Sequence, residues 1–548
     1  MEKHEKGGLE CSASHGDDVE ATQPPTGTEF SLAGQHDELA RGLKSRHIQF
    51  LALGGAIGTG LFVGSGGILS STGPAPLFMA YLSMMLIVWV VMNNLAEMVV
   101  YLPLRGITVP YFVGRFVDPS LSFACGWNYW YAYAILVGAE ASAAGIVIEY
   151  WQLPVNIAVW ITVVLAVMLL LNIVAVGYFG EAEFWFASIK LITICGLIIL
   201  GIVIFFGGAP RQDGVLGFHY WNAPGAFVQF KDVPGGAGRF LGYWHAFVKA
   251  GFAFITSPEL IAIAAGEAVA PRRNIPKAAR RFVWRLAVFY GLSSLIIGIL
   301  VPSDEPTLLG KANASASPFV IGITRVGIPA LNHIINAAIL TSAWSAGNSF
   351  LYSGSRVLYS MSLTGQAPAC FAATNRNGVP YLAVLFTWSI GLLAYLNVSN
   401  TGAVVFNWFV SISTTSGFIA WIAVMVTYLR FRRAMEFNRL LDALPYRTAL
   451  QPYATYAAVV VVLLLTLTNG FHTFMPSFAV KDFVASYVTL PIFLGLYLGH
   501  KLWFRTPLCI PVDQIDAISG KKEMDELEAT DKERVPRNWM QKMWYWVA

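Results

Sequence analysis

Charged residues are scarce in this chain. Asp, Glu, Lys and Arg together make up 12% of its 548 residues, whereas 56% of the residues are hydrophobic. Charged residues form roughly a quarter of an ordinary soluble protein, so this chain has too few of them for a soluble fold of its length. The formal net charge of +4 is small and gives no reason to expect a nucleic-acid partner. The composition therefore predicts an integral membrane protein.

Signatures of metal binding, redox chemistry and catalysis are also missing. The five cysteines show no CxxC pairing, so we expect neither a metal site nor a disulfide framework. The chain has no HExxH motif, no nucleotide-binding loop and no His-Asp-Ser set at a common membrane face. We therefore expect no enzyme activity and no cofactor.

Long apolar runs, by contrast, are abundant. A helix crosses a bilayer with about 17 to 25 apolar residues. Runs of that length are expected near residues 48–70, 77–101, 122–148, 155–176, 184–206, 245–268, 283–301, 332–360, 381–397, 403–428, 455–473 and 484–503. They predict an all-α membrane domain of about twelve helices over residues 47–504. We expect a cytosolic tail without a signal peptide at residues 1–46, which are polar and mixed in charge, and a second cytosolic tail at 505–548.

Basic residues indicate how the domain is oriented. With the N-terminus in the cytosol, the even-numbered connections between spans also face the cytosol, and two of these connections are rich in Lys and Arg. Their basic residues are Arg272, Arg273, Lys277, Arg280, Arg281, Arg285, Arg430, Arg432, Arg433, Arg439 and Arg447. The predicted orientation therefore places both termini in the cytosol.

Two expected spans contain helix-breaking residues at mid-membrane, in the first span at 54–60 (GGAIGTG) and in the sixth at 256–259 (TSPE). Glycine frees the backbone and proline removes a donor, so both helices can open there. Open backbone inside a membrane is tolerated only where it lines a protein cavity, and its free N–H and C=O groups can hold a charged solute. Spans one and six begin two successive groups of five, as in an inverted repeat, which indicates a transporter. The alternative is that the glycines only permit close helix packing.

A series of short motifs extends along the chain. In order, they are 55–62 (GAIGTGLF), 265–267 (AGE), 271–278 (PRRNIPKA), 348–352 (NSFLY), 365–368 (GQAP), 375–380 (NRNGVP) and 428–432 (YLRFR). Together they resemble the fungal amino-acid permeases of the amino acid–polyamine–organocation superfamily, over roughly residues 43–505.

The resemblance implies a fold of five-plus-five inverted helices with two further spans. It also implies proton-driven uptake of L-amino acids by alternating access across the plasma membrane. The implied partners are an amino acid, a proton, membrane lipid and, at the cytosolic tails, ubiquitin-ligase adaptors. Two alternatives stay open: a non-transporting amino-acid sensor of the same fold, and a carrier of a related amine such as γ-aminobutyrate, choline or a polyamine.

The resemblance also indicates substrate-binding positions. Thr59 and Gly60 match the positions whose N–H groups, with the threonine hydroxyl, receive the substrate α-carboxylate. An opened helix presents unpaired donors at the start of its continuing half, where the helix dipole favours an anion. The carbonyls that match the α-ammonium acceptors are those of Ala56, Ala253, Phe254 and Thr256. The family usually has a glycine two residues before the span-six glutamate, whereas Ser257 and Pro258 precede Glu259 here, which leaves the choice of span-six carbonyls open.

Charges inside the membrane are costly and therefore indicate function. Glu140 in span three and Glu259 in the span-six break are candidate substrate-binding residues. Glu97 either belongs with them or lies at a polar helix edge. Lys190 in span five either extends to the lipid headgroups or, as the resemblance implies, places its ammonium near spans one and eight, where it would couple transport to protons.

Two further features have more than one interpretation. Most aromatic side chains are expected to anchor the domain at the lipid interface, but Phe254 flanks the span-six break and is a site candidate. Span ten carries a hydroxyl-rich stretch at 411–416 (SISTTS), which either bonds between helices or lines a cavity.

Overall fold

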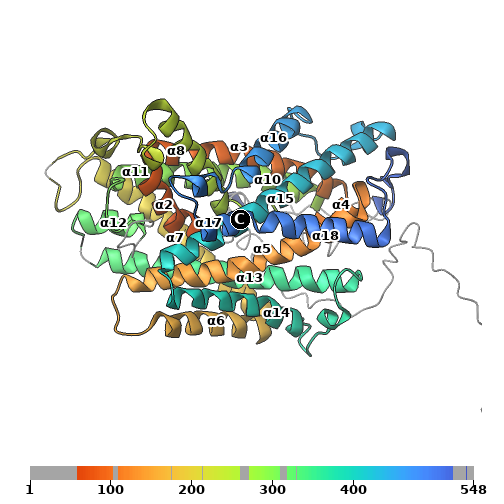
Figure 1. Ribbon diagram of the computed structural model, residues 1–548, viewed down its shortest axis with the longest axis horizontal. Helices are drawn as coiled ribbons and strands as arrows, with labels where there is room; N and C mark the ends of the chain where they lie inside the picture. The colour runs from red at the N-terminus through yellow and green to blue at the C-terminus, as the bar shows by residue number, and fades with distance from the viewer. Residues whose placement is uncertain are drawn as a thin grey trace, which may run out of the picture. The chain divides into compact units, whose positions relative to one another are not determined.

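The computed structural model of the chain describes residues 58–102, 109–174, 176–212, 214–259, 271–308, 317–328, 330–521 and 538–539. Within these ranges the regular structure is entirely helical and contains no strand, which agrees with the all-α prediction (Figure 1). The predicted N-terminal tail at 1–46 and the candidate residue Ala56 lie outside the described residues.

Seven of the described helical segments are long and apolar enough to cross a membrane. They are α3 (Pro74–Tyr101), α5 (Pro119–Glu149), α6 (Ile157–Val174), the Glu181–Phe205 part of α7 (Val176–Phe205), α14 (Tyr381–Gly391) with η7 (Leu392–Val398), α15 (Gly402–Phe437), and α16 (Tyr453–Leu467) with η9 (Phe471–Phe474). The pair α17 (Val480–Tyr487) and α18 (Thr489–Phe504), which is bent by 40°, makes an eighth if it is counted as one span.

The other expected spans are interrupted, short or polar, so length and apolarity alone do not identify them. They correspond to η1 (Gly60–Gly64) with α2 (Ser65–Thr72), α8 (Gly235–Ala250) with η4 (Gly251–Ala253), α10 (Pro271–Leu286) with η5 (Ala287–Gly291) and α11 (Leu292–Leu300), and α13 (Leu331–Leu363). The shorter elements outside the expected spans are α4 (Val109–Phe116), α12 (Pro318–Arg325), η2 (Trp221–Gly225), η3 (Phe230–Asp232), η6 (Ala369–Ala372), η8 (Leu441–Ala443) and η10 (Val512–Gln514).

Local sequence explains where helix α5 begins. Pro119 occupies its first turn, where a missing N–H costs no hydrogen bond. Asp118 precedes it, and its carboxylate accepts a hydrogen bond from the Leu121 N–H at 3.2 Å. The helix therefore has both the proline start and the capping side chain that favour initiation.

Helices α5 and α13 lie side by side through the middle of the bundle (Figure 1). In the most apolar stretch of α5, 94% of the residues are buried, against 28% for α6, so α5 is a core helix and α6 faces lipid. Small residues at 138–145 (GAEASAAG) let neighbouring helices approach α5 closely. This central position of α5 brings the Glu140 carboxylate next to Thr59 in the first expected span.

The described part of the predicted C-terminal tail packs against the bundle. Ile510 N donates to the carbonyl of Val117 at 2.9 Å, and the Tyr101 hydroxyl donates to the carbonyl of Ala517 at 2.8 Å. Arg115 holds the same segment through the carbonyl of Asp516 at 2.7 Å. Residues up to 521 therefore form a folded strap over the ends of α3 and α4.

Candidate functional site

The first segment predicted to open is only partly described: residues 54–57 lie outside the described residues, and from Thr59 the chain is helical through a wide π-helical turn, η1. Thr59 precedes this turn and is fully buried. A Cβ atom on Gly60 would lie 2.6 Å from the Cα of Ala253 in η4, far inside contact distance, so only glycine fits there. The Tyr81 hydroxyl of α3 donates to the Gly60 carbonyl at 3.1 Å. The first span therefore touches the broken part of the sixth span at Gly60 and Ala253.

The second opened segment confirms the predicted break in span six. Helix α8 ends at Ala250, a single 3-10 turn follows to Ala253, and residues 254–258 form turns rather than helix. Thr256 has φ +67°, a left-handed conformation that a β-branched residue rarely adopts. The Ala253 carbonyl accepts a hydrogen bond from the Tyr290 hydroxyl at 3.0 Å.

Phe254, a site candidate from its position beside the break, places its ring in an aromatic cluster. Its ring centroid lies 5.6 Å from that of Tyr81 and 4.6 Å from that of Tyr290. The ring is fully buried, so this side chain packs the break against α3 and η5. The Phe254 carbonyl accepts a hydrogen bond from the Ser257 N–H at 3.2 Å.

Glu140 of α5 lies directly against the first opened segment. Its Oε1 accepts a hydrogen bond from the Thr59 hydroxyl at 2.9 Å, and the carboxylate is almost fully buried. A threonine hydroxyl has one proton to donate. The proton of the Thr59 hydroxyl is therefore used by Glu140 in this arrangement.

Lys190 of α7 is 1% exposed, which contradicts the alternative that it extends to the lipid headgroups. Its ammonium interacts electrostatically with two carboxylates, Glu183 on the same helix and Glu140 on α5. Glu183 in turn accepts a hydrogen bond at Oε1 from the Ser345 hydroxyl of α13, at 2.7 Å. Buried charged groups from α5 and α7 thus gather beside the first opened segment.

Glu259 lies beside a different part of α5 from Glu140. It is buried, and its Oε1 accepts a long hydrogen bond of 3.4 Å from the Tyr129 hydroxyl of α5. Tyr129 precedes Glu140 by eleven residues on α5, about 16 Å along the helix axis. The structure therefore brings together Thr59, Gly60, Ala253 and Glu140, with Lys190 nearby, but not Glu259.

Glu97 is not a polar helix edge, because it is 1% exposed. Its carboxylate accepts hydrogen bonds from the Tyr428 hydroxyl at 2.7 Å and from the Thr448 N–H at 2.7 Å. The Thr448 hydroxyl donates to it as well. One turn earlier on α3, Asn93 accepts a hydrogen bond from the Tyr446 hydroxyl at 3.0 Å. Glu97 and Asn93 thus clamp the connection between α15 and α16 onto α3.

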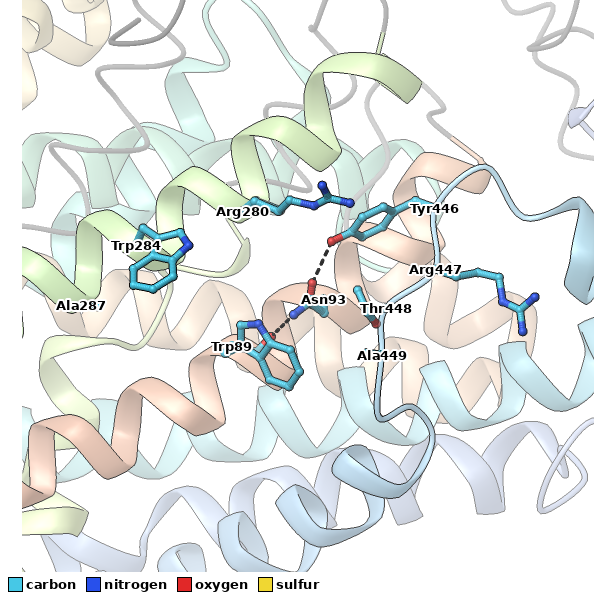
Figure 2. Close-up of a pocket in the computed structure, with 10 residues that line it drawn as sticks. Trp89, Asn93, Arg280, Trp284, Ala287, Tyr446, Arg447, Thr448 and Ala449 are labelled. Carbon is cyan, nitrogen blue, oxygen red and sulfur yellow. Dashed lines mark hydrogen bonds between the residues drawn. The ribbon is translucent and has the colours of Figure 1, made fainter.

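Figure 2 shows a cavity beside this clamp, of about 410 Å³. It is lined by residues of α3, of α10 with η5, and of the segment 446–449, among them Trp89, Arg280 and Trp284. Asn93, which also lines it, follows Tyr81 by twelve residues on α3, about 18 Å along the axis. None of the predicted site residues lines this cavity, so it is separate from the opened segments.

Sequence reasoning missed four residues of this region. Lys249, just before the span-six break, is half-buried and donates to the Ser411 hydroxyl at 2.8 Å. It lies inside an apolar run, so its charge was a usable signal. Glu183 falls one residue before the expected fifth span and was overlooked for that reason. Tyr81 and Tyr290 carried no signal, since nothing in the sequence distinguishes them from lipid-facing aromatic residues.

The hydroxyl-rich stretch of span ten bonds between helices. Thr415 donates to the Ser486 carbonyl at 2.9 Å and accepts from the Asn469 amide at 2.6 Å. The Ser416 hydroxyl donates to the Asn128 side chain at 2.8 Å. Ser411 contacts Lys249, as described above, so this end of the stretch faces the opened sixth span.

Comparison with known proteins gives a consistent result. The family model described as "Amino acid permease" matches residues 47–509. A proline-specific permease of Emericella nidulans is 54% identical over 519 residues, which cover 94% of each chain. A probable proline-specific permease of Schizosaccharomyces pombe is 53% identical over 90% of each chain. The proline-specific permease of Saccharomyces cerevisiae is 49% identical over 89% of this chain and 80% of its own length.

Proposed function

The chain belongs to the amino acid permease family and is a transporter rather than an enzyme, and from this premise we propose that its principal substrate is L-proline. The observation that carries the proposal is the 49% to 54% identity, over most of the chain, to three relatives named as proline-specific or probable proline-specific permeases. The alternatives of an amino-acid sensor and of a carrier for other amines lack such support.

The opened segments suit a proline zwitterion. Its carboxylate would meet the backbone N–H groups at Thr59 and Gly60, at the start of the wide turn η1. Its secondary ammonium has two N–H donors, one fewer than other amino acids. The carbonyls of Ala253 and Phe254 each already accept one hydrogen bond and have one lone pair left. A substrate with few donors matches acceptors with limited remaining capacity.

We further propose that transport is driven by protons through Lys190, in a twelve-span domain of five-plus-five inverted helices with two additional spans. Support comes from the burial of Lys190 beside Glu140 and from the break in span six, which opens the second group of five. The basic connections support cytosolic termini at the plasma membrane, where the tails would be available to ubiquitin-ligase adaptors.

Uptake by cells that lack their own amino-acid permeases tests the substrate. We expect the protein to restore uptake of labelled L-proline, and the other members of a full amino-acid panel to compete weakly. Surface labelling of the protein is the control for its arrival at the plasma membrane. If the protein is at the surface and no amino acid enters, the transport proposal fails and the sensor becomes the better interpretation. Uptake of another amino acid in preference to proline would overturn the substrate alone.

A further inference from the structure

A carboxylate that the mechanism above does not use lies deep in the bundle. Glu183 is 1% exposed, and its Oε1 accepts a hydrogen bond from the Ser345 hydroxyl at 2.7 Å. Its Oε2 is buried and has no hydrogen-bond partner among the described residues. An ionised carboxylate with an unsatisfied oxygen is costly in a membrane protein interior. The carboxylate must therefore be neutralised by a nearby cation or by a proton.

The nearby cation is Lys190. It follows Glu183 by seven residues on α7, about two turns and on the same face, and helical side chains lean toward the N-terminus, which directs the lysine toward Glu183. Electrostatic interaction links the lysine to Glu183 and also to Glu140. One ammonium thus lies within electrostatic range of two buried carboxylates.

The other elements around these groups add no second cation in the described region. Helix α13 contributes the hydroxyl of Ser345 to Glu183. Helix α6 has no charged residue along its length. The remaining ionisable group is Tyr290 of η5, which lies within electrostatic range of Glu140 and is neutral as a phenol. With all three groups ionised, the cluster of Glu140, Lys190 and Glu183 carries a net charge of −1.

We propose that Glu183 is the site that binds the transported proton, with Lys190 dividing its charge between Glu183 and Glu140 according to whether that proton is bound. A net buried charge is unfavourable, so the neutral state of the cluster holds one proton in addition to the three on the lysine ammonium. The proton enters Glu183 as H⁺ from one side and leaves as H⁺ to the other, and no other bond changes. This inference rests on the proposed proton-coupled transport.

The cluster connects the proton to the substrate through Glu140. When Glu183 is protonated, the Lys190 ammonium neutralises Glu140 alone. The hydrogen bond from the Thr59 hydroxyl to Glu140 is then weaker, and that hydroxyl becomes available to the substrate carboxylate. With Glu183 ionised, Lys190 is drawn away, and Glu140 retains the hydroxyl. Proton binding therefore raises substrate affinity. In the wild type, the KM for proline should rise by about tenfold for each pH unit above the midpoint, the slope for one proton.

The variant Glu183→Gln imitates the protonated carboxyl and tests the assignment. It should exchange labelled for unlabelled proline across the membrane with a KM that stays at the low-pH wild-type value at every pH, and it should not accumulate proline against a gradient. The matched control is Glu181→Gln, two residues earlier on α7, which should keep the wild-type pH dependence and accumulation.

A second variant keeps the assignment falsifiable if Glu183→Gln does not fold. Ser345→Ala removes the hydroxyl that donates a hydrogen bond to the Glu183 carboxylate, which destabilises the ionised form of Glu183. The pH at the midpoint of the KM change should therefore move upward by about one unit. Accumulation and a pH dependence like the wild type in Glu183→Gln, or an unmoved midpoint in Ser345→Ala, would overturn the role of Glu183. Failure of the transport proposal looks different, because the wild type itself would then take up no amino acid.

Discussion

Gly60 shows how a single residue determines whether the two opened spans can meet. A substituent at its Cα would meet backbone and not a flexible side-chain end, since Ala253 Cα lies 2.6 Å from the Cβ position. Gly64, in the same π turn, has nothing closer than 3.8 Å. The two glycines therefore differ in the space around them although they lie in the same turn.

Replacing Gly60 by valine should abolish proline uptake, because the added carbons force η1 and η4 apart at the predicted carboxylate position. The control Gly64→Ala should keep most of the uptake at equal surface expression. Measured initial rates of labelled proline uptake distinguish the two. Wild-type affinity in Gly60→Val would show that the substrate binds elsewhere.

Glu140 gives the second prediction at this scale. The variant Glu140→Gln keeps the shape and removes the charge that holds the Thr59 hydroxyl, so substrate ranking should change more than expression does. Thr59→Ser, which retains the hydroxyl, should transport well, whereas Thr59→Val should not. Competition profiles across the amino-acid panel provide the measurement. An unchanged profile in Glu140→Gln would leave this carboxylate a purely structural role.

At the scale of elements, the sequence predicted the break in span six better than its surroundings. Pro258 and its neighbours predicted the break in span six, because proline lacks the backbone N–H that a continuing helix needs. The ring of Phe254, however, packs against Tyr81 and Tyr290, whose positions beside it the sequence did not indicate. Which face an aromatic side chain takes depends on helices distant in the chain, and periodicity contains no such information.

Glu97 illustrates the same limit. Its charge inside a span suggested a functional group, yet it links α3 to Tyr428 of α15 and to Thr448 in the following connection. Those partners lie 331 and 351 residues away in the sequence, and no local pattern predicts them.

The variant Glu97→Ala should therefore reduce stability rather than alter coupling. It leaves a buried phenol and a backbone N–H without their acceptor, at about 1 to 3 kcal/mol for each group. A lower melting temperature of the detergent-purified protein, together with an unchanged pH dependence of the remaining uptake, is the expected result. The milder Glu97→Gln serves as the control and should lose less. Normal stability with altered pH dependence would instead make Glu97 a coupling residue.

At the scale of the whole molecule, composition predicted the membrane domain, and the family motifs predicted the transporter. Length and apolarity identify seven to eight spans among the described residues, because the other expected spans are interrupted, short or polar. Helix α13 is the clearest case, since its buried Ser345 and Asn348 lower its apolarity. Two of the spans that these criteria miss carry the proposed substrate positions at Gly60 and Ala253.

Proline uptake into proteoliposomes with an imposed pH gradient tests the account most directly. With acid outside and no other energy source, the wild-type protein should concentrate labelled proline, and a protonophore should abolish the concentration. Lys190→Ala should still equilibrate proline without concentrating it, because the buried ammonium that links the two carboxylates is gone. Equal proline inside and outside for the wild type under the gradient, or full concentration by Lys190→Ala, would contradict proton-coupled transport through this site.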